Sequence, residues 1–221
     1  MSDAAMTPFA IDSSDSPPVR GFLHRPPSAT GDALILSHGA SANCRTPLLV
    51  AVAQGFAAHG VTVLRCDLPY RQAVPTGPPP RDSAPRDRAG IRAAVAAARA
   101  LGAGRVFLGG HSYGGRQSSM LAAEDPAVAD ALLLLSYPLH PPRRPTELRT
   151  AHLPQLRTPA LFVHGTRDPF GSLEELRAAL SLIPAPTRLL PVEDGAHSLS
   201  VGVAETAVAV FLDFARVAIR A

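Results

Sequence analysis

A serine stands between glycines in the segment GGHSYGG, residues 109–115, directly after the apolar run RVFL at 105–108. The pattern G-x-S-x-G between a strand and a helix is typical of a nucleophile elbow, a sharp turn that exposes the serine hydroxyl above the end of the strand. Larger side chains at 110 and 114 would collide with neighbouring backbone. The segment therefore predicts nucleophilic catalysis by Ser112. The alternative is a glycine-rich turn with an incidental serine.

A serine hydroxyl becomes a useful nucleophile when an adjacent base removes its proton. After a nucleophile elbow the carboxylate and then the histidine follow the serine in chain order. Asp168 in GTRDPFG and His197 in EDGAHSL meet this order, and each follows an apolar run. Glu193 and Asp194 are too near His197 in sequence to approach it from another loop. We therefore expect Asp168 and His197 to complete a catalytic triad.

Each of these two residues also has a plainer interpretation. Asp168 precedes Pro169 and can be a turn former, and His197 can be a surface histidine of a loop. Two other histidines fit the base less well. His164 ends an apolar run and is expected to be buried, and His111 is expected to point away from the serine.

Attack on a carbonyl creates an oxyanion, which needs preorganised hydrogen-bond donors. The backbone N–H of Tyr113 is one predicted donor, because it follows the nucleophile. The second is predicted in the loop after the run ALILS, most simply the N–H of Ala40, with Ser41 as the next choice. His38 begins this loop and is interpreted as a structural histidine that bonds loop backbone.

Short apolar segments alternate with helical segments along most of the chain. Strands are predicted at 19–24, 33–37, 61–64, 105–108, 131–135, 160–164 and 188–192. Helices are predicted at 47–59, 88–101, 113–123, 173–182 and 203–219, and the Pro-rich residues 70–85 are expected to form a loop. The strands lack a clear period of two, which is typical of strands buried on both faces of a parallel sheet.

This alternation predicts an α/β fold with a mostly parallel, doubly wound sheet and helices on both faces. Ligands bind such sheets at the carboxyl ends of the strands, where all the candidate residues lie. We expect one domain over residues 1–221, with an irregular N-terminal segment over 1–18. The stretch 136–160 is short and Pro-rich, so it has room for one small helix near 146–153 and for little or no cap domain.

The composition narrows the class of protein. Hydrophobic residues make up 46% of the 221 residues, and the formal net charge is +3. The basic residues are all arginine and are spread along the chain, whereas nucleic-acid binders cluster their charge, so no nucleic-acid partner is expected. No apolar run reaches the length of a membrane span, and no signal-peptide pattern is visible, which predicts a cytoplasmic protein that does not bind membranes. Cys44 and Cys66 are interpreted as reduced packing residues.

No cofactor or metal is predicted. The eight histidines form no H-x-x-x-H or H-E-x-x-H pattern, and the chain has no phosphate-binding G-x-x-x-x-G-K-[ST] loop. The Gly109-Gly110 pair is not a dinucleotide fingerprint, because the third glycine is misplaced.

Taken together, these residues resemble the α/β-hydrolase superfamily from Val19 to the last helix, and the HG-x loop is similar to dienelactone hydrolase relatives. Four strings, GHSYGGR (110–116), SYPLHPP (136–142), LRTAHLPQL (148–156) and FVHGTRDPFG (162–171), resemble a subfamily that includes a testis-expressed protein and the hydrolase-like region of a non-specific-lethal chromatin complex subunit. The resemblance implies an α/β-hydrolase fold with the triad Ser112, Asp168 and His197. It supplies no substrate.

The first functional hypothesis is a serine hydrolase that cleaves a carboxylic ester or a thioester of a small substrate, with an acyl-enzyme on Ser112. The second is a binding or scaffold module on a hydrolase fold, with weak or no turnover. A peptidase is the third, although a small uncapped domain offers no obvious place for a peptide terminus. The sequence leaves the oligomeric state open.

Candidate substrate contacts are Ser41, Tyr70, Arg116 and Phe170. Tyr70 and Phe170 either line the pocket or pack internally. Arg116, Arg143, Arg144 and Arg167 lie near the predicted site and are candidates for recognition of a carboxylate or phosphate. The alternative is that Arg116 and Arg167 pair with internal carboxylates and hold loops.

Overall fold

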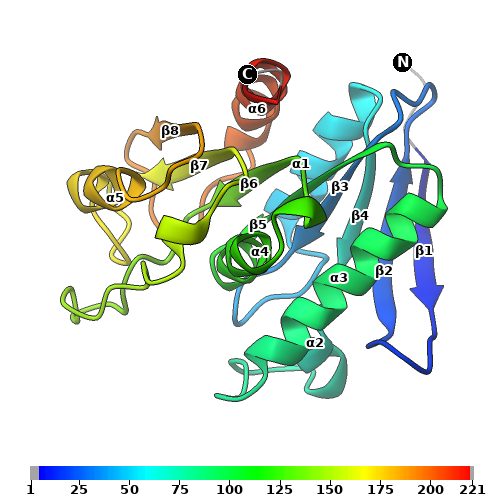
Figure 1. The fold of residues 1–221 in the computed structure, drawn as a ribbon, viewed down its shortest axis with the longest axis horizontal. Coiled ribbons are helices and arrows are strands. Elements are labelled where there is room, and N and C mark those ends of the chain that lie inside the picture. Colours follow the sequence, from blue (N-terminus) through cyan, green and yellow to red (C-terminus); the bar gives the residue numbers. More distant parts are fainter. Residues whose placement is uncertain (1–4, 220–221) are drawn as a thin grey trace.

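The fold is built on one eight-stranded sheet, seen in a computed structural model that describes residues 5–219 (Figure 1). The strand order is β1-β2-β4-β3-β5-β6-β7-β8. The strands are β1 (Ala5–Ile11), β2 (Val19–Arg25), β3 (Asp32–Ser37), β4 (Thr62–Cys66), β5 (Arg105–His111), β6 (Ala131–Leu135), β7 (Ala160–Gly165) and β8 (Thr187–Val192). β2 is antiparallel to β1 and β4, and the remaining neighbours are parallel.

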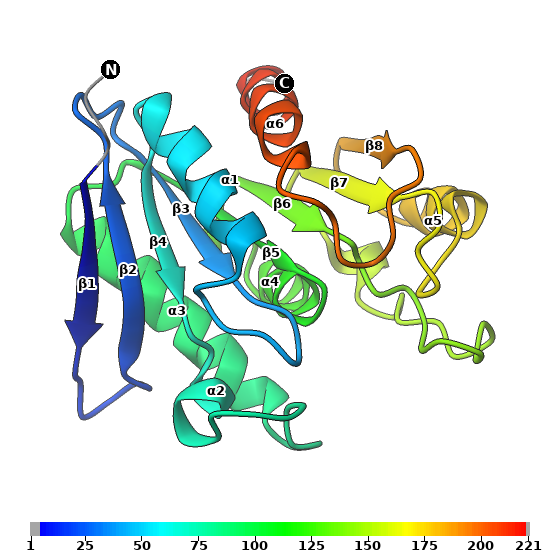
Figure 2. The ribbon, with the colours of Figure 1, turned by 180° about the vertical axis from the view of Figure 1, so that it is seen from behind.

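Helices cover both faces of the sheet, as Figures 1 and 2 show from opposite sides. The helices are α1 (Pro47–Ala58), α2 (Pro69–Ala73), α3 (Ala84–Ala100), α4 (Tyr113–Glu124), α5 (Leu173–Leu180) and α6 (Val203–Ala218). Side chains of α1 and α6 form one buried cluster with the sheet, and side chains of α3, α4 and α5 form the other. The predicted mostly parallel α/β architecture is therefore confirmed.

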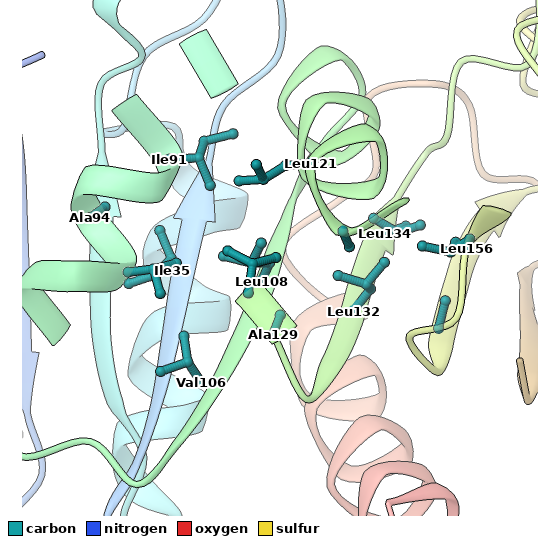
Figure 3. Close-up of a cluster of buried hydrophobic side chains, with 14 of the residues drawn as sticks. Ile35, Ile91, Ala94, Val106, Leu108, Leu121, Ala129, Leu132, Leu134 and Leu156 are labelled. Carbon is teal, nitrogen blue, oxygen red and sulfur yellow. The ribbon is translucent and has the colours of Figure 1, made fainter. Parts of the chain in front are cut away.

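Successive side chains of the central strands point alternately into the two buried clusters. Leu108 and Leu132 point to the cluster shared with α3 and α4 (Figure 3), whereas Phe107 and Leu133 point to the cluster shared with α1 and α6. Because both faces are covered, both sets of side chains are apolar. This explains the continuous apolar runs without a period of two.

The prediction of an irregular N-terminal segment is wrong for residues 5–11 and correct for 12–18, while residues 1–4 lie outside the described part of the chain. Residues 1–18 were expected to be irregular, but 5–11 form β1, which pairs with β2 from Ala5 opposite Arg25 to Ile11 opposite Val19. Pro8 obscures the strand pattern, yet it is tolerated because β1 lies at the edge of the sheet. Most of the described side chains of β1 are exposed, so the strand carries little apolar signal.

The Pro-rich stretch 70–85 also differs from the expected loop. It begins within the short helix α2 and ends within the first turn of α3, which starts at Ala84 rather than 88. Pro69 and Pro85 lie at the N-termini of these helices, where the missing N–H of proline costs no hydrogen bond. Proline therefore marks two helix starts here.

The stretch between β6 and β7 forms no helical cap. It holds one 3₁₀ turn at Leu153–Gln155, at the end of the region where a small helix was expected. No helix within residues 5–219 is both long and apolar enough to span a bilayer.

Candidate active site

The turn between β5 and α4 has the geometry of a nucleophile elbow. Ser112 adopts φ 51° and ψ −115°, a strained conformation for a residue with a side chain. Its N–H donates to Leu135 O at 2.8 Å, which anchors the turn to β6. A Cβ on Gly110 would lie 2.6 Å from Ser37 O, and one on Gly114 would lie 2.6 Å from His38 O. Both positions therefore require glycine, as the sequence predicted.

The structure brings together the three side chains predicted as a triad. His197 Nε2 lies 2.8 Å from Ser112 Oγ, and His197 Nδ1 lies 2.8 Å from Asp168 Oδ2. The Asp168 side chain is fully buried and also accepts the N–H of Phe170 at 2.8 Å. With Nδ1–H donating to the carboxylate, Nε2 is free to accept the serine proton. This is the tautomer that a general base requires.

Two further side chains support the His197 loop. Phe170 stacks on the imidazole, with ring centroids 4.0 Å apart. His111 Nε2 donates to the backbone carbonyl of His197 at 2.8 Å, and burial lowers the pKa of His111. His111 therefore contributes a neutral donor that holds the loop, and its other nitrogen faces Gly39.

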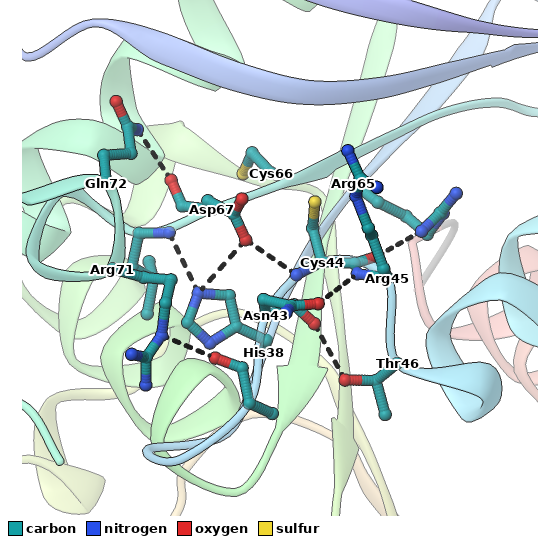
Figure 4. A network of polar contacts seen from close by, with 12 residues as sticks. His38, Asn43, Cys44, Arg45, Thr46, Arg65, Cys66, Asp67, Arg71 and Gln72 are labelled. Atoms are coloured by element: carbon teal, nitrogen blue, oxygen red, sulfur yellow. Dashed lines mark hydrogen bonds and ion pairs between the residues drawn. The ribbon is translucent and has the colours of Figure 1, made fainter. Parts of the chain in front are cut away.

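Hydrogen bonds from His38 and from two residues of α2 hold the loop after β3. His38 Nδ1 donates to Gly39 O at 2.8 Å, and Nε2 accepts the N–H of Leu68 at 3.1 Å (Figure 4). Burial lowers the pKa of His38, which is consistent with this neutral, structural role. The structural interpretation of His38 is thereby confirmed. Tyr70 Oη donates to Ala40 O at 2.7 Å, and the Arg71 guanidinium donates to the same carbonyl at 3.1 Å.

One protein family matches most of this sequence. The pattern of the family described as "Alpha/beta hydrolase domain" matches residues 30–209, most of the chain. The chain belongs to the α/β-hydrolase family.

Solved structures share the fold of this α/β hydrolase. Est1E from Butyrivibrio proteoclasticus is 20% identical, with a TM-score of 0.74 over 93% of this chain and 98% of the other. Dienelactone hydrolase from Anabaena variabilis is also 20% identical, with a TM-score of 0.74 over 96% and 97%. XC6422 from Xanthomonas campestris, described as an α/β serine hydrolase without lid, is 16% identical, with a TM-score of 0.71 over 93% and 94%.

One buried carboxylate of the hydrolase was missed in the sequence. Asp87 is 0% exposed and accepts the N–H of Tyr70 at 3.0 Å, the hydroxyl of Tyr113 at 2.8 Å and the hydroxyl of Ser83 at 3.0 Å. It thus joins the residue after Ser112 to the residue that holds the Ala40 carbonyl. Asp87 lies just after the expected Pro-rich loop, so its burial gave no local signal.

A cavity of about 650 Å³ opens at Ser112 and is lined by both predicted oxyanion donors, Ala40 and Tyr113. Of the candidate substrate contacts, Ser41, Arg116 and Phe170 also line it. Tyr70 does not. It is 4% exposed, and burial raises its pKa to about 12, so it packs behind the loop and does not face the cavity.

The other arginines near the site are placed differently from one another. Arg143, Arg144 and Arg167 do not line the cavity, and Arg167 pairs with exposed Asp194 at 2.6 Å. Arg81 and Arg149, which the sequence did not single out, do line it. Arg81 precedes α3 and Arg149 follows β6, in irregular segments whose paths the sequence did not reveal.

Neither of the two cysteines lines this cavity. Cys44 and Cys66 are free and buried. Burial raises the pKa of both thiols, that of Cys44 to about 12, so neither is a reactive thiolate. Within the described part of the chain, no three His, Cys, Asp or Glu side chains are grouped to hold a metal ion.

Proposed function

We propose that this α/β hydrolase is a serine hydrolase that cleaves a carboxylic ester, or a thioester, of a small substrate without a cofactor. The observation that supports this best is the continuous hydrogen-bond chain from Ser112 Oγ through His197 to buried Asp168. The strained elbow adds to it, because such backbone strain persists where the surrounding structure and function require it. The neighbours described as a dienelactone hydrolase and as a serine hydrolase without lid agree with this class.

In the proposed reaction, His197 Nε2 takes the Ser112 hydroxyl proton while Oγ attacks the ester carbonyl. The N–H groups of Ala40 and Tyr113 stabilise the resulting oxyanion. His197 then gives its proton to the leaving oxygen or sulfur, and the acyl group stays on Ser112. A water molecule loses a proton to His197 and attacks the acyl-enzyme, which releases the carboxylic acid and returns the proton to Ser112. Asp168 holds the imidazole tautomer throughout.

The open cavity favours a small substrate, or one that extends into solvent. No helical cap covers Ser112, and the cavity volume of about 650 Å³ is in the usual range for small-molecule sites. The cytoplasmic location and the resemblance to the testis-expressed and chromatin-complex relatives stay predictions.

A fluorophosphonate probe tests the proposal. We expect labelling of the natural protein and its loss in Ser112→Ala and His197→Ala, because both the nucleophile and its base are needed. The exposed Ser181, on the C-terminal side of α5, provides the matched control Ser181→Ala, which should label normally. Turnover of 4-nitrophenyl esters should fall by several powers of ten in the two site variants. A folded protein without labelling or turnover would instead support the binding or scaffold module.

A further inference from the structure

The cavity at Ser112 is positively charged. Arg81, Arg116 and Arg149 line it, and none of its lining residues is Asp or Glu. Arg81 is exposed at the rim, whereas Arg116 and Arg149 are partly buried in the wall. A cavity with low-dielectric walls and charges of one sign concentrates ligands of the opposite sign.

Arg116 lies one helical turn after the nucleophile and has no carboxylate partner. Its N–H donates to Ser112 O at 2.9 Å, which places it on the first turn of α4. Its Nε is buried without a hydrogen-bond partner, and within residues 5–219 its guanidinium forms no ion pair. By contrast, Arg88, on neighbouring α3, pairs with Glu124 at 3.0 Å. Arg116 therefore brings to the cavity a positive charge that no carboxylate of the described residues pairs with, so it is available to an anionic ligand.

Arg149 reinforces the same charge. Its guanidinium donates to the backbone carbonyl of Pro138 at 3.4 Å, a weak contact, and it too has no ion pair within the described residues. The neighbouring Glu147 lies on the surface and pairs with Arg144. Burial, and then the positive charge of Arg116, lower the pKa of Arg149. The two guanidinium groups therefore repel each other, and both line a cavity that contains no Asp or Glu.

The positive charges of Arg116 and Arg88 also act on His152. Its Nε2 lies 2.9 Å from Ser119 Oγ, and its pKa is lowered to about 4 by burial, then by Arg116 and Arg88. Histidine is either neutral or positive, so His152 cannot supply the missing negative charge. The lining of the cavity thus contains arginines and histidines but no Asp or Glu, and the carboxylates of Glu124 and Glu147 already pair with other arginines.

We propose that Arg116 and Arg149 bind an anionic oxygen group of the substrate, a carboxylate or a phosphate, while the ester carbonyl lies at Ser112. This inference rests on the proposed hydrolase function and adds the substrate class. Guanidinium groups suit this task because their planar donors match the oxygen geometry of either anion. Binding would supply the counter-charge that Arg116 and Arg149 lack and would offset the repulsion between them.

Three esters with one chromogenic leaving group test this substrate class: the mono-4-nitrophenyl ester of adipic acid, its methyl ester, and a 4-nitrophenyl ester with a terminal phosphate. We expect kcat/KM to be about 10-fold to 100-fold higher for at least one anionic ester than for the neutral one, as suits a charged hydrogen bond. The better of the two anions identifies the group. Arg116→Gln and Arg149→Gln should each remove most of the preference, because each lowers kcat/KM for the anionic ester far more than for the neutral one.

Arg216→Gln is the matched control, because it removes the same charge from the exposed side of α6, away from the cavity. It should keep the full preference. Equal turnover of all three esters by the natural protein would overturn the inference, and so would an Arg116→Gln variant that loses neutral and anionic turnover alike. In either case fluorophosphonate labelling of Ser112 would show that the hydrolase function stands.

A binding measurement keeps the test independent of turnover. Monomethyl adipate, titrated calorimetrically into Ser112→Ala protein, should bind at least 10-fold more tightly than dimethyl adipate. Adding Arg116→Gln to this background should abolish the difference. If both esters bind equally, or neither binds, the anion site is refuted even if the triad proves inactive.

Discussion

Asp87→Ala should loosen both sides of the predicted oxyanion hole at once. The Asp87 carboxylate accepts the N–H of Tyr70 and the hydroxyls of Tyr113 and Ser83, at 2.8 to 3.0 Å. Tyr113 follows the nucleophile, and Tyr70 holds the carbonyl of Ala40. Alanine removes all three acceptor contacts without touching Ser112. The variant therefore asks whether a buried carboxylate positions the donors.

The magnitude follows from what each donor can do afterwards. The buried N–H of Tyr70 is left without its acceptor, which costs about 1–3 kcal/mol. The hydroxyls of Ser83 and Tyr113 already lie 3.4 Å apart and can bond each other, so they lose less. We expect the free energy of unfolding to fall by about 3 kcal/mol. Loss of a whole oxyanion donor costs about 10²–10³ in kcat, so displacement of donors that remain present should cost about tenfold.

Asp87→Asn is the matched variant. Its amide oxygen can accept the N–H of Tyr70, and its NH₂ can donate to the hydroxyl of Tyr113, so kcat should stay within about threefold. Urea denaturation gives the stability of both variants. Ester turnover per fluorophosphonate-reactive site gives kcat for the folded fraction alone. If Asp87→Ala folds and its kcat per active site equals that of the natural protein, the positioning argument is refuted. A KM change at constant kcat would refute it equally.

Two further changes test the elbow and the buried histidines. Gly110→Ala should abolish fluorophosphonate labelling, because its Cβ would lie 2.6 Å from Ser37 O; a folded, fully labelled variant would contradict the elbow geometry. His24 Nε2 accepts the Nε–H of Arg65 at 2.9 Å. Burial, and then the positive charge of Arg65, lower the pKa of His24 to about 4. The unfolded chain therefore binds a proton between about pH 6.5 and 4 that the native state does not, so unfolding free energy should fall as pH drops through this window, by at most about 1.4 kcal/mol per pH unit for this group. The pKa of His152 is lowered in the same way, so His152 contributes its own loss of stability over this pH range. His24→Gln should therefore reduce, but not remove, the slope of the unfolding free energy against pH measured by urea denaturation. An unchanged slope would refute a neutral His24.

The candidate site was predictable because local sequence determines where parallel strands end. Ser112, Asp168 and His197 each follow an apolar run that forms a strand, namely β5, β7 and β8. The carboxyl ends of parallel strands meet at one edge, so residues far apart in the chain must converge there. The glycines of the elbow carried the remaining information, because their need is steric and local.

Other features depended on partners that are distant in sequence. β1 forms by pairing at the edge with β2, and its exposed side chains and Pro8 conceal it in the pattern. Asp87 becomes a buried anchor only because α3 packs beside α2 and α4, where Tyr70 and Tyr113 supply donors. Tyr70 was an open choice between pocket and packing, and packing behind the loop decides it.

The sequence alone determined the order of the strands and helices along the chain from β2 to α6, apart from α2, together with the glycine-bounded turn at Ser112 and the loops that carry Asp168 and His197. Those properties arise from contiguous residues, whose apolar runs and backbone freedom specify local structure. Only the tertiary structure decided that Asp87 is buried and that Arg116 and Arg149 share a wall without a carboxylate. Burial and charge pairing depend on neighbours brought together by packing, and no local pattern encodes which neighbours those will be.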